Sequence, residues 1–471
     1  MKFVRHAFLY GVLILVFGGL IYFLLHQGNQ IYTAPKPELP AGKTLETGLS
    51  VSIFQNNLQE ALPRLLLQIV IIIAATRTVG FLFKRIGQPA VIGEIVAGLL
   101  LGPSLFGLLF PHAFQFIFPV ESLPNLRFLS QIGLILFMFI IGMELDTRLL
   151  RKQAFEAVII SHASIVIPFS LGIFISYYLY GNYAVPHTRF ISFALFMGIA
   201  MSITAFPVLA RIIRDRKLSD TRLGNLAIGC AASDDVTAWC ILAMLVALIR
   251  SGSGMNGIIV IGTVILYAIA MLVPVRLMMN KIQRTFEQGK IGYNGLMAAI
   301  FTMLLLSSWT TEVIGIHALF GAFLAGIIIP KNENLQKRII DRISDVTIVM
   351  LLPLFFVYTG LRTQAGLLNS PLLWGSFVMI LICAVAGKFG GSALVAKALG
   401  QSWRNSLSIG ALMNTRGLME LIVLNIGYDM GILSPEIFSM MVLMALITTM
   451  MTNPLLNWIG AENELEFHKN I

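Results

Sequence analysis

Long apolar stretches separated by short polar segments run along almost the whole chain. A helix that crosses the hydrocarbon core of a membrane needs about 20 mostly apolar residues. Fourteen stretches come near this length or exceed it, around residues 7–26, 62–82, 88–108, 128–146, 153–180, 190–213, 223–249, 256–279, 293–311, 315–330, 343–363, 372–396, 405–427 and 435–458. The pattern predicts an all-α polytopic membrane protein with 13–14 transmembrane helices.

Composition excludes most other classes of protein. Of the 471 residues, 57% are hydrophobic and only 12% are charged, which is too little charged surface for a soluble domain. The three cysteines, Cys230, Cys240 and Cys383, lie inside apolar stretches, so neither a disulfide framework nor a metal-binding spacing is present. We expect no cofactor apart from a transported ion.

The basic residues are concentrated in alternate loops. The segments FKR (83–85), RLLRK (148–152), RIIRDRK (211–217), KIQR (281–284) and KNENLQKR (331–338) fall on one side if the N-terminus is inside. Lysine and arginine mark cytoplasmic loops. The net charge of +10 is therefore a topology signal and not a nucleic-acid surface. We expect both termini in the cytoplasm and a bacterial inner membrane around the protein.

The chain divides into three parts by this reading. Residues 1–61 would form an extra first helix followed by a polar, Pro/Gly-rich periplasmic link, residues 62–460 the main membrane domain, and residues 461–471 a short cytoplasmic tail. The basic start MKFVRH also suits a cleaved signal peptide, but the apolar run is long and no A-x-A cleavage site follows it. We favour a retained helix.

Two blocks, about 88–249 and 315–458, carry similar features in the same order. The matching segments are AGLLLGP (97–103) with AGIIIP (325–330), LFMFIIGMELD (136–146) with LPLFFVYTGLRT (352–363), and AMSITAFPVLA (200–210) with ALMNTRGLMEL (411–421). The span count gives the blocks opposite starting sides. We therefore expect two inverted five-helix repeats, an architecture of secondary transporters with the substrate site at the repeat interface.

The third matching pair predicts two broken helices. Pro207 lacks a backbone N–H, and its ring crowds the carbonyl of Ile203. In the second block, helix-weakening residues surround the charge of Arg416. Irregular backbone at membrane depth occurs where it lines a cavity or is buried in protein, so we expect a site here; kinks that serve only packing are the alternative. The candidate residues are Thr204, Ala205, Phe206 and Pro207 with Asn414, Thr415, Arg416 and Gly417.

Charges inside the spans point to an ion site. Asp234 and Asp235 lie near the middle of one span, and Lys388 lies near the middle of another. Adjacent helical positions point about 100° apart. One aspartate can therefore pair with Lys388 while the other faces a cavity and binds a proton or a metal cation. A buried ion-pair network without a transport role is the alternative.

Other polar residues have weaker claims. Ser233 and Thr204 are candidate hydroxyl ligands beside the two aspartates. Glu420 follows Arg416 by four residues, a spacing at which helical side chains pair, and we expect it to support the site structurally. Glu94 is a further supporting candidate that could hold helices or pair with loop bases.

At this level of detail the chain resembles a known family. The segments IGQPAVIGEIVAGLLLGPSLFG (86–107), SITAFPVLARI (202–212), SDDV (233–236), GIHALFGAFLAG (315–326) and MNTRGLMELIVLNIG (413–427) resemble the monovalent cation:proton antiporter superfamily. Its nearest branch holds the NapA-type and Kef-type bacterial exchangers and the plant cation/proton exchangers.

The resemblance implies a homodimer with crossed broken helices and elevator-like movement of a six-helix core. It places the cation- and proton-carrying role on Asp235 and the family lysine on Lys388, which leaves Asp234 to pair with Lys388. Two features leave the choice between Na⁺ and K⁺ open. The Asp-Asp-Lys set is similar to electrogenic sodium exchangers, whereas MNTRG is similar to plant exchangers linked to potassium. Thr204-Ala205 also replaces an acid that some sodium exchangers have.

The sequence thus predicts a transporter, not an enzyme, that exchanges Na⁺ or K⁺ for protons. Two other functions stay open. One is a ligand-gated K⁺ efflux system of Kef type whose soluble regulator would be a separate chain. The other is a non-transporting membrane sensor or scaffold built on the same fold.

Overall fold

The computed structural model describes residues 60–144, 154–216, 218, 221–251, 254–330, 332–367 and 369–460. All of them belong to the second of two units, Met1–Gln59 and Glu60–Ile471. The expected first helix at 7–26, nearly all of the link that follows it, and the tail at 461–471 lie outside the described residues.

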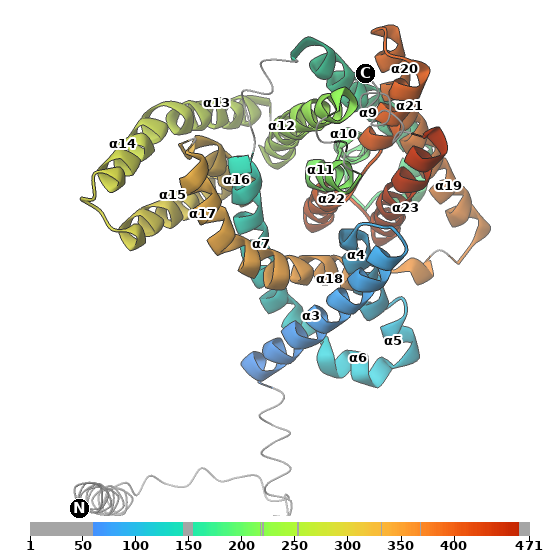
Figure 1. The fold of residues 1–471 in the computed structure, drawn as a ribbon. Helices are drawn as coiled ribbons and strands as arrows, with labels where there is room; N and C mark the ends of the chain where they lie inside the picture. Colours follow the sequence, from blue (N-terminus) through green and yellow to red (C-terminus); the bar gives the residue numbers. More distant parts are fainter. Residues whose placement is uncertain are drawn as a thin grey trace, which may run out of the picture. The chain divides into compact units, whose positions relative to one another are not determined.

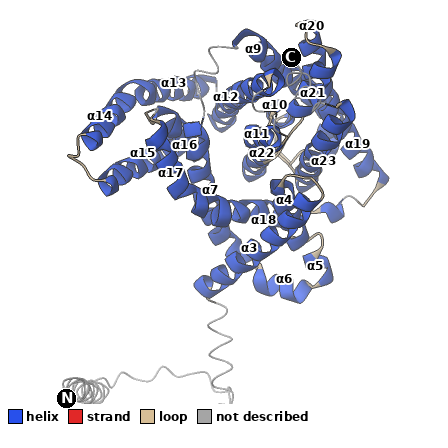
Figure 2. Cartoon of the chain, viewed as in Figure 1, coloured by secondary structure: helices blue, strands red, loops and turns tan. Residues whose placement is uncertain are grey.

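Helices make up the described chain almost entirely, and no strand occurs in it beyond one isolated bridge between Ala184 and Leu433 (Figure 2). The first half contains α3 (Ala61–Arg85), α4 (Ala90–Leu101), α5 (Phe106–Leu109), α6 (Pro111–Ile117), η1 (Val120–Ser122), α7 (Leu123–Glu144), α9 (Ala154–Tyr183), α10 (Phe190–Ser202), α11 (Phe206–Asp215) and α12 (Arg222–Ser251).

The second half begins with a pair of connecting helices. Its elements are α13 (Gly254–Ala270), η2 (Met271–Val275), α14 (Arg276–Glu287), α15 (Tyr293–Ile314), α16 (Ala318–Ile328), α17 (Glu333–Ser344), η3 (Asp345–Leu351), α18 (Leu352–Arg362), η4 (Ala365–Leu367), α19 (Pro371–Val385), η5 (Ala386–Gly390), α20 (Gly391–Ala398), α21 (Trp403–Met413), α22 (Leu418–Asp429) and α23 (Pro435–Ile459).

The helices have the length and hydropathy of membrane spans. Ten helical stretches of the described chain are long and apolar enough to cross a bilayer, and α21 with α22 forms an eleventh when counted as one bent span. The apolar helices α10 and α16 are shorter, at 13 and 11 residues. These findings confirm the all-α membrane protein that the sequence predicted.

Packing separates two sets of helices (Figure 1). We call α3, α4, α7, α15, α16 and α18 the frame group, because each packs on a neighbour in this set. We call α9–α12 and α19–α23 the crossing group, in which α9 contacts α10, α12, α19 and α20. In Figure 1, α13–α15 lie at the far side of the described bundle from α19–α21.

Glycines bring the frame helices into backbone contact. A Cβ on Gly98 of α4 would lie 2.5 Å from the carbonyl oxygen of Phe356 on α18, and a Cβ on Gly142 of α7 would lie 2.2 Å from that of Phe323 on α16. Helices in membranes associate through such small residues, since lipid supplies no hydrophobic drive between them. The frame group is consequently closely packed.

Both expected breaks are present in the crossing group. The first interrupts the helix between Ser202 and Phe206, and the second between Met413 and Leu418, with a bend of 43° between α21 and α22. The breaks meet, because the backbone N–H of Ala205 donates to the carbonyl of Thr415 at 3.0 Å. Gly417 has a φ of 156°, a conformation that favours glycine. The two extended segments therefore cross in contact.

Candidate functional site

A buried ion pair lies beside the crossing. Lys388 Nζ on η5 is 2.8 Å from Asp234 Oδ2 on α12, and neither side chain is exposed. This is the pair that the sequence predicted. A buried charge is tolerated when it has an opposite charge and further hydrogen bonds, and the surroundings of the pair supply them.

Three hydroxyl groups surround the pair. Ser161 donates to Asp234 Oδ1 at 2.7 Å, while Ser164 and Thr204 donate to Oδ2 at 3.0 and 2.6 Å. Lys388 Nζ donates to the Ser164 and Thr204 hydroxyls at 2.7 and 2.6 Å. The carboxylate of Asp234 is therefore held by four donors, one of them charged.

Asp235, the next residue on α12, differs from Asp234 in its hydrogen bonding. Its side chain is 2% exposed, and within the described chain neither carboxylate oxygen has a hydrogen-bond partner. The backbone N–H of Phe206, at the start of α11, faces this carboxylate but lies outside hydrogen-bond geometry. Buried polar groups almost always have a partner. A carboxylate without one can accept a proton or a cation.

Local backbone features place Lys388. The residue sits in η5, a π-helical turn, and such turns are frequent at functional sites. A Cβ on Gly387 would lie 2.9 Å from Cα of Pro168 on α9, so only a glycine permits this approach of the two helices. The approach brings Lys388 against Ser164, which lies one turn before Pro168.

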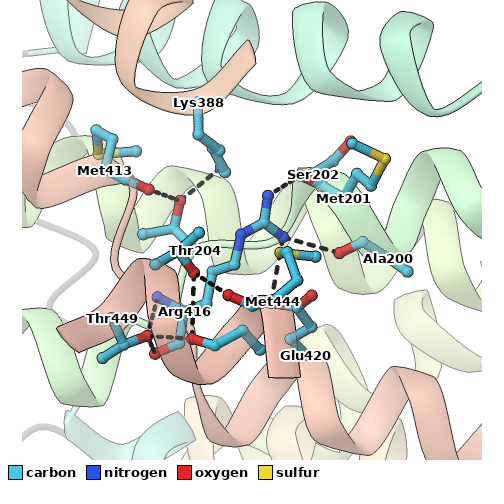
Figure 3. Close-up of polar contacts among 12 residues, drawn as sticks. Ala200, Met201, Ser202, Thr204, Lys388, Met413, Arg416, Glu420, Met444 and Thr449 are labelled. Carbon is cyan, nitrogen blue, oxygen red and sulfur yellow. Dashed lines mark hydrogen bonds and ion pairs between the residues drawn. The ribbon is translucent and has the colours of Figure 1, made fainter. Parts of the chain in front are cut away.

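Arg416 occupies the crossing itself, fully buried (Figure 3). Its guanidinium donates to the carbonyls of Ala200 and Met201, at 3.1 and 2.6 Å. These carbonyls belong to the last turn of α10, where the helix dipole is negative. Glu420 lies 3.2 Å from the same guanidinium, which confirms the expected i,i+4 pair. The positive charge of Arg416 therefore offsets both the partial negative charge at the C-terminal end of α10 and the negative charge of the Glu420 carboxylate.

The remaining sequence candidates lie at varied positions. Asn414 is fully buried, and neither of its side-chain polar atoms has a partner in the described part of the chain. Thr415 Oγ1 contacts Thr452 at 3.2 Å. Ser233 is buried on α12, but the hydroxyls that contact Asp234 among the described residues belong to other positions. Glu94 lies on α4, 3.8 Å from Arg77, apart from this cluster.

A cavity of about 1020 Å³ opens between α11 and the helices α7, α17 and α18. Its polar lining includes Glu144, Arg211, Arg214 and Lys337. Phe206 also lines it, and the backbone of this residue faces Asp235. Asp235 itself is not among the described residues that line the cavity, and Phe206 is the lining residue next to it.

An ion-pair cluster lies at the other end. Asp429, the last residue of α22, is 3.0 Å from Arg127 of α7 and pairs with Arg362, the last residue of α18. Arg362 also donates to Asn425 at 2.9 Å. Arg127 and Glu144 are separated by about 25 Å along α7, at 1.5 Å per residue. We call Asp429 with its two arginines the Asp429 cluster.

Sequence reasoning missed several of these residues. Ser161 and Ser164 are spaced so that they share one helix face, which is the only signal that could have found them. Arg127, Arg362 and Asp429 stand near span ends, where charged residues are ordinary, so their meeting was not visible in the sequence.

Comparison with known proteins decides the family. Residues 68–458 match the family model described as "Sodium/hydrogen exchanger, transmembrane". The chain belongs to this family. Na(+)/H(+) antiporter NhaS4 of Synechocystis sp. (strain PCC 6803) is 45% identical to this exchanger-family chain over 392 residues, which are 83% of the chain and 96% of the relative.

Eukaryotic relatives are longer than this sodium/hydrogen exchanger family member. Cation/H(+) antiporter 17 of Arabidopsis thaliana is 41% identical over 86% of the chain, and K(+)/H(+) antiporter 1 of Saccharomyces cerevisiae is 31% identical over 86%. These matches cover 50% and 47% of the relatives, so the chain spans about half their length. The relatives are named as transporters, in agreement with the expectation that the chain is not an enzyme.

A solved structure shares the fold. The sodium proton antiporter MjNhaP1 from Methanocaldococcus jannaschii at pH 8 superimposes with a TM-score of 0.58, covering 85% of this chain and 98% of that one, at 14% identity. At this identity the likeness concerns the fold alone. The resemblance to the monovalent cation:proton antiporter superfamily is confirmed.

Proposed function

We propose that the protein exchanges a monovalent cation, Na⁺ or K⁺, for protons across the membrane, with Asp235 carrying the cation or the proton. The observation that supports this most is the buried Asp235 carboxylate, which has no partner among the described residues and lies next to a fully hydrogen-bonded ion pair. A proton and a cation compete for the same oxygens, and that competition is what couples the two fluxes.

The Asp234–Lys388 pair provides a second proton. When a cation binds near Asp234, Lys388 loses its electrostatic partner and releases a proton, while Asp235 releases the other. Two protons then exchange for one cation, and each cycle moves one net charge. A potential of 100 mV acts on that charge with about 2.3 kcal/mol. This is enough to support a cation gradient of about 50-fold.

The two ends of the site support a proposal of alternating access. The large cavity and the Asp429 cluster lie near opposite ends of α7, so this conformation is open on one side and closed on the other. The side chains of the Asp429 cluster join α22 of the crossing group to α7 and α18 of the frame group. We propose that the crossing group moves against the frame group in an elevator-like step.

Orientation and assembly complete the proposal. Arg211 and Arg214 of α11 and Lys337 of α17 line the large cavity and belong to lysine- and arginine-rich segments between spans, which favour a cytoplasmic face; we propose that the cavity opens to the cytoplasm. The cyanobacterial relative supports a bacterial inner membrane. The family resemblance supports a homodimer, with residues 62–460 as the exchanger domain, residues 1–61 as an extra helix and link, and residues 461–471 as a cytoplasmic tail.

Purified protein in liposomes tests the function. The liposomes carry an imposed pH gradient and a pH-sensitive dye. Addition of Na⁺, K⁺ or Li⁺ is expected to produce a proton flux that addition of buffer alone does not produce. A conductive K⁺ efflux system would instead pass K⁺ without proton counterflow. A sensor or scaffold would give no movement with any cation, and either result would overturn the exchanger proposal.

The Lys388→Gln substitution tests the charge coupling. Gln keeps hydrogen-bonding capacity but cannot titrate, so any remaining exchange is expected to become one-for-one. A membrane potential imposed with a thiocyanate gradient should change the rate of Na⁺-driven exchange severalfold in the native protein and leave the variant unaffected. If the exchange rate of the native protein does not change with the membrane potential, two-proton coupling is contradicted.

The Asp429→Asn substitution tests closure at the far end of α7. The amide removes the charge that both arginines share, while its size stays nearly the same. We expect a larger fraction of the protein molecules to adopt the conformation that is open at this end of α7. A Ser130→Cys substitution should then be labelled several times faster by an impermeant maleimide. Ser130 lines the small cavity beside the Asp429 cluster. Equal labelling rates in both backgrounds would show that the cluster does not hold this end closed.

A further inference from the structure

Another cavity lies at the end of the crossing group that is away from the large cavity. It measures about 580 Å³ and is bounded by the start of α10 with the loop before it, the last turns of α12, and the loop between α22 and α23. Because α10 begins at this cavity while α11, which continues the same span, lines the large one, the two cavities lie at opposite ends of that span. We call this one the α10 cavity. Its volume is in the range of ligand-binding pockets.

The lining of the α10 cavity divides into a polar part and an apolar part. The polar groups come from His187, Thr188, Arg189 and Ser192, and the arginine carries a permanent positive charge. The apolar part consists of aliphatic side chains, which include Leu195, Leu245, Ile249 and Ile432. No acidic residue is among the described residues that line the cavity. A ligand that suits both parts carries a negative charge next to an apolar chain.

Contacts between the loops hold the walls of the α10 cavity in place. The isolated bridge between Ala184 and Leu433 joins the loop before α10 to the loop between α22 and α23. The Thr188 hydroxyl donates to the carbonyl of Gly431 at 3.2 Å, and the Tyr180 hydroxyl of α9 donates to the carbonyl of Thr188 at 2.6 Å. The loop that carries the polar groups of the cavity is therefore fixed by bonds within the protein.

Exposed tyrosines place the α10 cavity at the level where the membrane meets water. Tyr177 and Tyr178, near the end of α9, are 70% and 60% exposed. Tyrosine is enriched at this level, because its ring is apolar and its hydroxyl is polar. The ring centroid of Tyr177 lies 4.8 Å from that of Phe190, the first residue of α10. Ile191, which lines the cavity, is 68% exposed, so the cavity opens onto the lipid-facing surface.

We propose that the α10 cavity binds an anionic phospholipid, with the phosphate at Arg189 and the start of an acyl chain along the apolar part. A guanidinium forms paired hydrogen bonds with phosphate oxygens. The first turn of α10 adds backbone N–H groups and the positive end of the helix dipole, and its N-cap residue, Arg189, makes no side-chain capping bond. Asp429, which precedes the lining residue Met430, is already paired with two arginines.

Substitutions of Arg189 separate its charge from the shape of the cavity. Arg189→Gln removes the permanent charge, whereas Arg189→Lys keeps it but loses the paired hydrogen-bonding geometry. The residue is exposed, so neither change leaves a charge unpaired in the protein interior. Arg338→Gln is the matched control, because Arg338 is an exposed arginine on α17 that does not line the cavity. Thermal unfolding in detergent verifies that each variant is folded.

The experiment uses a phosphatidylglycerol that carries a photoreactive diazirine at the start of one acyl chain. After irradiation of the native protein in detergent, we expect the label on peptides that contain residues 186–195 and 245–249, which border the cavity. Unlabelled dioleoyl-phosphatidylglycerol should compete for these positions at about tenfold lower concentration than dioleoyl-phosphatidylcholine, which has the same chains and no net charge. Labelling confined to other parts of the chain, or equal competition by the two lipids, would overturn the inference.

The variants and free phosphate complete the test. Arg189→Gln should lower the labelling of these peptides about tenfold. Arg189→Lys should keep most of it, and Arg338→Gln should keep all of it. Inorganic phosphate in excess should leave the label in place, because the apolar part of the cavity contributes to lipid binding. Displacement by phosphate would instead indicate a site for a free anion, and that result, or full labelling of Arg189→Gln, would contradict the lipid site. These measurements do not depend on cation exchange.

Discussion

Asp235→Asn is expected to abolish cation-dependent proton movement, with the rate falling at least about 100-fold, to the background of protein-free liposomes. The amide has nearly the shape of the carboxylate, but it can neither release a proton nor balance a bound cation. Because the native carboxylate has no hydrogen-bond partner in the described chain, its replacement breaks no hydrogen bond there. Expression and thermal stability should therefore match or exceed those of the native protein.

Asp341→Asn is the control for this substitution. Asp341 lies exposed on α17 and undergoes the same chemical change, and we expect native exchange rates from it. The measurement is dye-reported proton flux after addition of Na⁺ and, separately, K⁺. Exchange that persists in Asp235→Asn with either cation would remove Asp235 from the carrier role and direct attention to Asp234.

Arg416→Gln is expected to give the largest loss of stability. It removes the charge that pairs with Glu420 and the donors to the carbonyls of Ala200 and Met201. Removing one partner of a buried pair costs about 3–5 kcal/mol, because the other charge stays buried alone. We expect a Tm many degrees lower in detergent, and exchange to be lost with it.

The double variant Arg416→Gln with Glu420→Gln tests whether the lower Tm comes from the unpaired charge of Glu420 or from the changed shape of the side chain at position 416. If the unpaired carboxylate causes the instability, the second change should recover a substantial part of the lost Tm. The carbonyls at the end of α10 would still lack their charged donor, so recovery should be partial. A single Arg416→Gln variant as stable as the native protein would show that the pair contributes little to folding.

Much of the fold follows from local sequence features. The proline at 207 and the weak helix formers around Arg416 predicted both breaks, because a missing N–H or a competing side chain acts within one turn. The Arg416–Glu420 pair followed from its four-residue spacing. The need of a central lysine for an acid predicted that Lys388 pairs with Asp234 or Asp235, and the structure shows Asp234 as the partner. Each of these inferences concerns charge or backbone chemistry that few arrangements can satisfy.

The hydroxyl ligands could not be found in this way. Serines in apolar helices commonly bond a carbonyl of their own preceding turn, as Ser170 does to Val166 at 2.9 Å and Ser176 to Gly172 at 2.7 Å. Ser161 and Ser164 lie on the same helix and look no different in the sequence. Their role depends on which helix packs opposite them, and that is a property of the tertiary structure.

The Asp429 cluster and the large cavity were also beyond the sequence. Arg127, Arg362 and Asp429 are far apart along the chain, and each is an ordinary charge at a span end. A sequence is also shared by every conformation of a transporter, so it does not show which side of the site is open. Only the placement of the helices distinguishes the end that holds the cavity from the end that holds the Asp429 cluster.

The hydrogen bond between Ala205 and Thr415 joins the two breaks through main-chain atoms alone. Only proline at position 205 would remove its donor, because every other amino acid supplies the same N–H there and every amino acid supplies the carbonyl at position 415. The charges around the crossing belong to side chains, which substitution can change. A change of side chain at the crossing can therefore alter the charge around the site while the main-chain contact between the two breaks persists.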